Sequence, residues 1–85
     1  MLYRILTENI NQKKVKEIVS RQFDGFSIIN SVGYWKGSKE KSLIIEISGD
    51  KKIKSNIVSC ANLIKKENKQ DAVLIQSFSD NSFLI

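Results

Sequence analysis

Two stretches of this 85-residue chain repeat their apolar residues at the spacing of an amphipathic α-helix. The stripe in residues 11–23 consists of Val15, Ile18, Val19 and Phe23. The stripe in residues 51–67 consists of Ile53, Ile57, Cys60, Ala61 and Ile64. Asn9 or Asn11 can cap the first helix, and Asp50 can cap the second. Each helix has only one apolar side, so both need an apolar surface to pack against.

The segments around these helices alternate apolar and polar residues, as β-strands do. We predict four strands, at residues 2–7, 26–36, 42–48 and 70–78. Residues 37–40 are a short polar connection that makes the second and third strands a hairpin. The first helix should end near Asp24-Gly25, and the second at Asn68-Lys69. This order predicts one α+β domain over residues 1–85 with the ferredoxin-like βαββαβ arrangement, in which both helices cover one face of a four-stranded antiparallel sheet.

Such a sheet has a second face without helices, and here that face is apolar. The alternation assigns to the helix side Tyr3, Ile5, Phe26, Ile28, Val32, Leu43, Ile45, Ile47, Val73 and Ile75. It assigns to the open side six large apolar residues: Leu6, Ile29, Trp35, Ile44, Leu74 and Phe78. Burial of each would contribute about 1.5 to 3 kcal/mol, and monomers seldom expose such a patch. We therefore predict that these six residues form an interface between copies of the chain.

Three polar residues, Arg4, Glu46 and Gln76, share the open side with them. Arg4 is a possible cross-strand partner of Glu46, and we expect an ion pair or an interfacial hydrogen bond for Glu46, in preference to an acid-base role.

The composition favours an anionic partner and offers little for catalysis. Fourteen Lys and Arg against nine Asp and Glu give a net charge of +5, which does not choose among nucleic acid, nucleotide and acidic protein. The chain has no histidine and a single cysteine, Cys60, on a helical apolar stripe. No catalytic motif, metal cluster or Walker loop occurs, so we expect no enzyme, no metal and no cofactor.

The expected location is the cytoplasm. The first nine residues, MLYRILTEN, lack the features of a signal peptide, and the longest apolar runs are far too short to span a bilayer.

One segment resembles a known family. Residues 31–47, with an aromatic pair, a glycine hairpin and Leu-Ile-Ile, are similar to the Tyr-Trp-x-x-Gly stretch and following strand of the CutA-like divalent-cation tolerance proteins, relatives of the PII (GlnB-like) signalling proteins. Phe83-Leu84-Ile85 corresponds to that family's aromatic C-terminal segment. The resemblance implies a homotrimer with sheets packed face to face, and clefts between subunits where PII proteins bind nucleotides.

The resemblance does not extend to metal binding or to nitrogen signalling. The His-Pro-Tyr-Glu-Val-Pro segment of the CutA-like proteins corresponds here to residues 68–73, which contain neither histidine nor proline. The long effector loop of PII proteins is replaced by about four residues between the second and third strands.

A second resemblance is to an uncharacterised family of small bacterial and phage domains. Its pattern is F-x-D-G-F-x-I, then G-x-W, then Q-x-x-V-L. Here the corresponding segments are Phe23 to Ile28 with a slightly altered order, Gly33 to Trp35, and Gln70 to Leu74.

The candidate ligand-binding residues are one aromatic pair and five lysines: Tyr34, Trp35, Lys36, Lys39, Lys41, Lys51 and Lys52. We expect Tyr34 at the rim of the core and Trp35 in a subunit interface. The alternative is that Trp35 with Lys36 stacks on and pairs with an anionic aromatic ligand. Lys51 and Lys52 begin the second helix, where backbone amides favour anions.

The hypothesis from the sequence is a non-catalytic homotrimer that binds a small anionic ligand, nucleotide-like, in inter-subunit clefts, as a regulatory or sequestering protein of a bacterium or phage. The alternative is a protein-interaction or inhibitor module, for example a phage protein that acts on a host protein, which uses the apolar sheet face. Nucleic-acid binding through the lysines is not expected. RNA-binding sheets carry paired aromatic residues on a single face, and the predicted sheet has no such pair.

Overall fold

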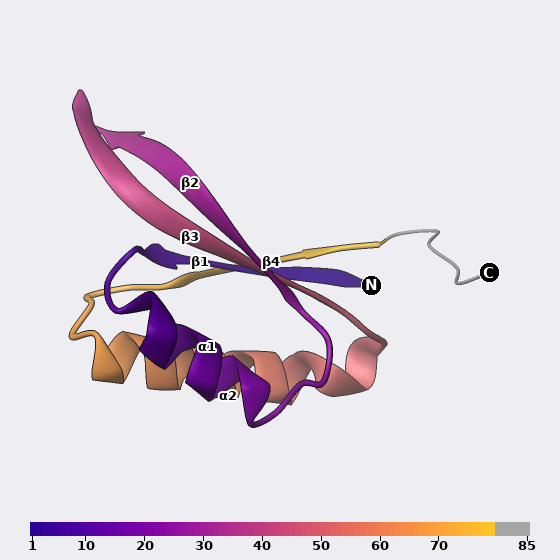
Figure 1. Ribbon diagram of the computed structural model, residues 1–85. Helices are drawn as coiled ribbons and strands as arrows, with labels where there is room; N and C mark the ends of the chain where they lie inside the picture. The colour runs from indigo at the N-terminus through magenta and orange to yellow at the C-terminus, as the bar shows by residue number, and fades with distance from the viewer. Residues whose placement is uncertain (80–85) are drawn as a thin grey trace.

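The computed structural model describes residues 1–79, with the exception of the side chain of Trp35. Its elements are β1 (Leu2–Glu8), α1 (Gln12–Ser20), β2 (Ser27–Trp35), β3 (Ser38–Ser48), the 3-10 turn η1 (Lys51–Ile53), α2 (Lys54–Glu67) and β4 (Leu74–Phe78). The strands form one antiparallel sheet in the order β2-β3-β1-β4. Both helices lie on the same side of this sheet (Figure 1). The chain therefore has the α+β, ferredoxin-like fold that the order of its elements predicts; Phe83-Leu84-Ile85 lie outside the described residues.

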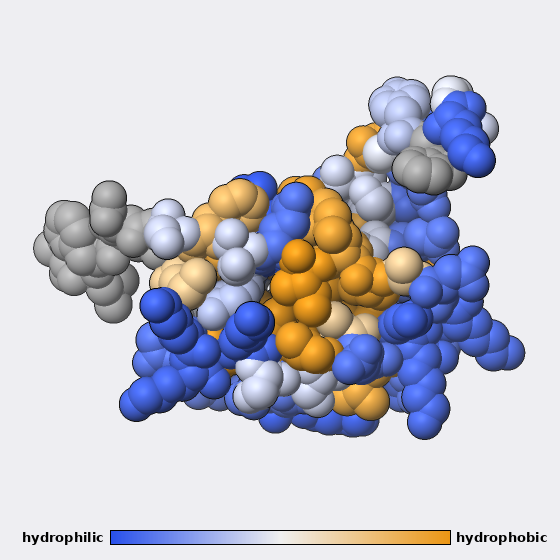
Figure 2. Space-filling view, turned by 180° about the vertical axis from the view of Figure 1, so that it is seen from behind, coloured by the Kyte–Doolittle hydropathy of each residue, from blue (hydrophilic) through white to orange (hydrophobic). Residues whose placement is uncertain are grey.

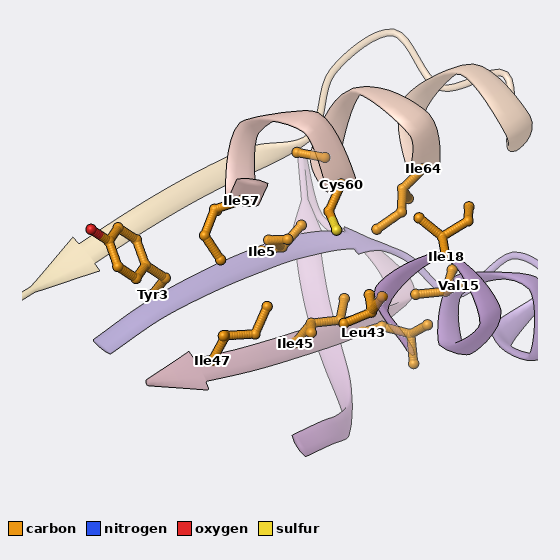
Figure 3. Packing of buried hydrophobic residues seen from close by; sticks show 12 residues of the cluster. Tyr3, Ile5, Val15, Ile18, Leu43, Ile45, Ile47, Ile57, Cys60 and Ile64 are labelled. Carbon is orange, nitrogen blue, oxygen red and sulfur yellow. The ribbon is translucent and has the colours of Figure 1, made fainter. Parts of the chain in front are cut away.

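The core lies between the two helices and the central strands (Figure 3). From the sheet come Tyr3, Ile5, Leu43, Ile45 and Ile47, and from the helices Val15, Ile18, Val19, Ile57, Cys60, Ala61 and Ile64, all buried. These residues belong to the two predicted helical stripes and to the predicted helix side of β1 and β3. Phe23 and Ile53, the other members of the stripes, are partly buried and pack against this core. Cys60 is a free thiol inside this cluster, and burial raises its pKa, so it acts as a small apolar core residue.

The helices begin where predicted but differ in detail. The Asn11 side chain accepts a hydrogen bond from the amide of Lys14 at 3.3 Å, and that of Asp50 accepts one from the amide of Lys52 at 2.8 Å. Asp50 caps a 3-10 turn that leads into α2. The first helix ends at Ser20, before the predicted Asp24-Gly25, because the chain already turns at residues 21 and 22.

The hairpin of β2 and β3 is longer than predicted. A two-residue turn, Lys36-Gly37, replaces the expected connection at residues 37–40, so β3 begins at Ser38. Both turn residues have positive φ, 50° and 80°, as in the type I′ turns whose twist matches that of the flanking strands. Residues 31–42 consequently form a two-stranded arm that rises away from the helix layer (Figure 1).

Two predictions about side chains of the arm are wrong, because the arm extends beyond the helices. Val32 was predicted to face the helices and Tyr34 to lie at the core rim, but they are 49% and 73% exposed. Strand alternation determines the side of the sheet on which a residue lies, and here the helices do not extend far enough to cover that side.

The fourth strand is shorter than predicted, because it begins at Leu74 and not at residue 70. Gln70 instead joins the α2–β4 connection to the end of β1: its amide donates to the Thr7 hydroxyl and accepts from the amide of Glu8. Neither helix within residues 1–79 has the length and apolar composition that crossing a membrane requires.

Candidate functional site

The open face of the sheet carries a continuous line of apolar side chains. Ile29 pairs with Ile44, Ile44 with Leu6, and Leu6 with Leu74, so one residue of each strand contributes. We call these four residues the apolar row. On the same face, Leu2 pairs with Phe78. Figure 2 shows hydrophobic side chains gathered at the centre of one side of the molecule, beside the projecting arm.

Next to the apolar row lies a polar row, which consists of Ser27, Glu46, Arg4 and Gln76 in register across the strands. Arg4 Nε donates to Glu46 Oε2 at 2.7 Å, which confirms the predicted ion pair. The Arg4 guanidinium also lies 5.4 Å from the centre of the Phe78 ring. A carboxylate and an aromatic ring therefore both contact this guanidinium.

The open face is free of lysine within the described strands, although the chain has a net charge of +5. The charged residues in register on this face are Arg4, Glu8, Glu40 and Glu46. Apart from Arg4, which pairs with Glu46, the positively charged residues thus lie on the helices, in the turns and connections, and on the other side of the arm.

That other side of the arm brings together several predicted ligand-binding residues. Tyr34 pairs directly with Lys39, and Val32 with Lys41, and all four side chains are exposed. At the tip, a hollow of about 440 Å³ is lined by Lys36, Ser38, Lys39 and Glu40. An exposed aromatic ring beside lysines can stack on a planar group and pair with an anion.

The structure separates Lys51 and Lys52 from the arm. They follow β3, whose 11 residues run from the arm to the opposite end of the sheet, a span of about 35 Å at roughly 3.3 Å for each residue. The Lys52 amide, which was predicted to favour an anion, already donates its hydrogen bond to the Asp50 side chain. One chain therefore does not combine these two lysines with Lys39 and Lys41 in one site. Trp35 ends β2 opposite Ser38, and its predicted roles stay predictions.

A groove of about 750 Å³ lies where the arm, the end of β1 and the α2–β4 connection meet. Its lining consists of Leu6, Thr7, Glu8, Tyr34, Glu40, Ser42, Gln70, Ala72, Val73 and Leu74. Only Tyr34 among these was predicted to bind a ligand, and Leu6 and Leu74 were predicted as interface. The sequence did not reveal the groove, because its lining comes from four segments that no local pattern connects.

Two carboxyl groups meet in this groove. Hydrogen bonding to Glu40 raises the pKa of Glu8, and desolvation and the negative charges of Glu40 and Asp71 add to the effect. The groove thus combines apolar walls, an aromatic ring and oxygen acceptors that suit N–H or O–H donors of a ligand. Among residues 1–79, no group of three or more His, Cys, Asp or Glu side chains is placed to hold a metal ion.

Comparisons with known proteins give matches in structure alone, since no family model and no curated protein sequence matches. A DUF3240 family protein from Shewanella baltica OS155 is similar at TM-score 0.73 and 17% identity, over 99% of this chain and 94% of that one. A phage SAM lyase in its apo state is similar at TM-score 0.70 and 19% identity, over 87% of this chain and 75% of that one.

The third similar structure is CPII, a nitrogen regulatory PII-like protein from Thiomonas intermedia K12, bound to ADP, AMP and bicarbonate. Its TM-score is 0.65 and its identity 9%, over 98% of this chain and 93% of that one. The chain thus shares its ferredoxin-like fold with these three proteins, and this is the fold that the resemblance in its sequence implies.

Proposed function

We propose that the chain is a cytoplasmic, non-catalytic binding module, which assembles as a homotrimer through its open sheet face and holds a small anionic ligand, such as a nucleotide, in clefts between copies. It would act as a regulatory or sequestering protein of a bacterium or a phage. The observation that carries this proposal is the apolar row, which crosses all four strands on the face without helices.

Exposure and charge support self-association through this face. Ile29, Leu74 and Phe78 are 42%, 55% and 41% exposed in the single chain. Covering such side chains is favourable by about 25 cal/mol for each Å² of apolar surface removed from water. Basic chains repel one another through their lysines, and the open face has none, so a second copy can approach there.

The position of the groove supports a ligand site at the boundary between copies. The groove shares Leu6 and Leu74 with the apolar row, so a copy packed on the row would supply a further wall. Glu8 and Glu40 in the groove can accept hydrogen bonds from a base or sugar. Tyr34 also lines the groove and pairs with Lys39 on the other side of the arm, so a ligand that extends to that side can pair its phosphates with Lys39 and Lys41. ADP and AMP, named with the PII-like neighbour, combine both kinds of group.

The assembly is tested by sedimentation equilibrium and native mass spectrometry of the wild-type chain. We expect a single trimeric species at micromolar concentration. A chain that stays monomeric would contradict the proposed assembly and favour the alternative, in which the apolar face docks a different protein.

Ligand binding is tested by calorimetry against ADP, AMP and SAM at physiological salt. We expect the double substitution Lys39→Gln with Lys41→Gln to weaken binding of the best ligand at least about tenfold, equivalent to about 1.4 kcal/mol. The control is Lys65→Gln with Lys66→Gln on exposed positions of α2, which changes the net charge equally. Equal losses in both variants would mean that the arm holds no specific site.

The absence of catalysis is part of the proposal and has its own test. SAM and nucleotides incubated with the protein and separated by chromatography should be recovered unchanged. Turnover of any of them that scales with protein concentration would make the chain an enzyme.

A further inference from the structure

We propose that the polar row sets the register in which the open faces of two copies pack, so that one assembly is selected out of several that the apolar row alone would allow. This inference rests on the self-association proposed above and adds a specificity role for Arg4, Glu46 and Gln76. No catalytic or ligand-binding role is involved.

The first step is the position of the row. It lies between two apolar parts of the open face, the apolar row on one side and the Leu2–Phe78 pair on the other. Any copy that covers both apolar parts must also cover the polar row between them. Arg4 and Glu46 are already partly covered in the single chain, with side chains 40% and 24% exposed.

The second step is the number of unused hydrogen-bonding groups in the row. A guanidinium has five N–H donors, and Arg4 contacts Glu46 through Nε. In a single chain its terminal N–H groups and the Gln76 amide are left to water, since no described residue binds them. If they are covered without partners, each costs about 1 to 3 kcal/mol.

The third step is the source of the partners. Every copy carries the same donors and acceptors in the same row, so a copy can satisfy another only when its polar atoms lie opposite. Glu46 keeps an acceptor oxygen that Arg4 Nε does not use, and Gln76 both donates and accepts. Registers that place these groups against the apolar row leave them unpaired and are therefore disfavoured.

The fourth step explains why the pair is not itself the main source of affinity. A buried ion pair often contributes no more than apolar side chains of similar volume would. The best-attested role for an isolated polar group in an apolar interface is the choice of register and oligomeric state. The polar row has that arrangement: one ion pair and one amide beside an apolar row of four.

The test replaces the pair by apolar residues of similar size, Arg4→Met with Glu46→Leu, which keeps the net charge. We expect association as tight as in the wild type or tighter, but several species in native ion-mobility mass spectrometry, which separates assemblies of equal mass by their shape, where the wild type shows one. The matched control is Lys13→Met with Glu17→Leu at exposed positions of α1, which should leave a single species.

A single species identical to that of the wild type would overturn the inference and leave the proposed assembly intact. A monomeric wild type would overturn the proposed assembly, and the inference with it. Circular dichroism shows whether the double variant is folded. If it is not folded, the single substitution Gln76→Leu on edge strand β4 tests the inference in its place. That variant keeps the ion pair and should also give more than one species, whereas one species would count against the polar row.

Discussion

Glu8 lies at the end of β1, where the carboxyl of Glu40 approaches it from β3. Hydrogen bonding to Glu40 raises the pKa of Glu8, so the folded chain holds this proton more tightly than the unfolded chain does. A raised carboxyl pKa contributes stability below the unfolded value of 4.5, and this is lost as the pH rises through the folded value.

We therefore expect Glu8→Gln to raise the melting temperature at pH 7, by about 1 to 2 °C, since water screens this pair. The difference should shrink below pH 4 and in 1 M salt. Thermal unfolding of Glu8→Gln, Glu40→Gln and the double variant at one protein concentration measures it. The increases in melting temperature of the two single variants should not add in the double variant, because either substitution removes the same repulsion. Additive increases would mean that the two carboxyl groups do not interact.

At the scale of single residues, the sequence predicted what strand alternation decides. It placed Arg4 beside Glu46, because both lie on the polar positions of one sheet face. It could not predict the exposure of Val32 and Tyr34, which depends on how far the helices extend along the sheet. Contacts such as that between Glu8 and Glu40 require the register of β1 against β3, which no local pattern contains.

At the scale of elements, the positions of helices and strands were predictable, and the turn of the hairpin was not. Residues 38–41 are polar because the arm is solvated on both sides, and polar residues of a solvated strand resemble a loop. The decisive feature is Gly37, whose φ of 80° is unfavourable for any residue with a side chain. Lys36 has a φ of 50°, in a region where asparagine is tolerated better than lysine.

The turn gives a prediction with an internal control. Gly37→Ala should destabilise the fold by about 1 kcal/mol, which for a small domain corresponds to a melting temperature lower by about 4 to 8 °C. Gly25→Ala is the control, because the backbone is not left-handed there and nothing lies within 4 Å of an added Cβ. Equal melting temperatures for both variants would show that the turn does not need a left-handed glycine.

At the scale of the whole molecule, the order of six elements and two amphipathic stripes determined the fold class before any contact was known. The same alternation predicted an apolar open face, and the structure places Leu6, Ile29, Ile44 and Leu74 there in register. The separation of the arm lysines from Lys51 and Lys52 was not predictable, because it depends on the length of β3.

This arrangement leads to a prediction about the assembly. Leu74→Glu introduces a charge at the edge of the apolar row, on a side chain that is 55% exposed in the single chain, so the monomer should fold with little loss of stability. In the assembly that charge would be buried without a partner, which costs several kcal/mol. We expect the variant to sediment as a folded monomer at concentrations at which the wild type should form the proposed trimer.

The control is Leu63→Glu, because Leu63 is 39% exposed on α2, on the helix side of the molecule. This variant introduces the same charge at a comparable apolar position outside the open face, so it should keep the oligomeric state of the wild type. If Leu63→Glu dissociates the assembly and Leu74→Glu does not, copies associate through their helices and the open face has another partner. Since the groove shares Leu74 with the apolar row, calorimetry on the monomeric Leu74→Glu variant should also show weakened nucleotide binding.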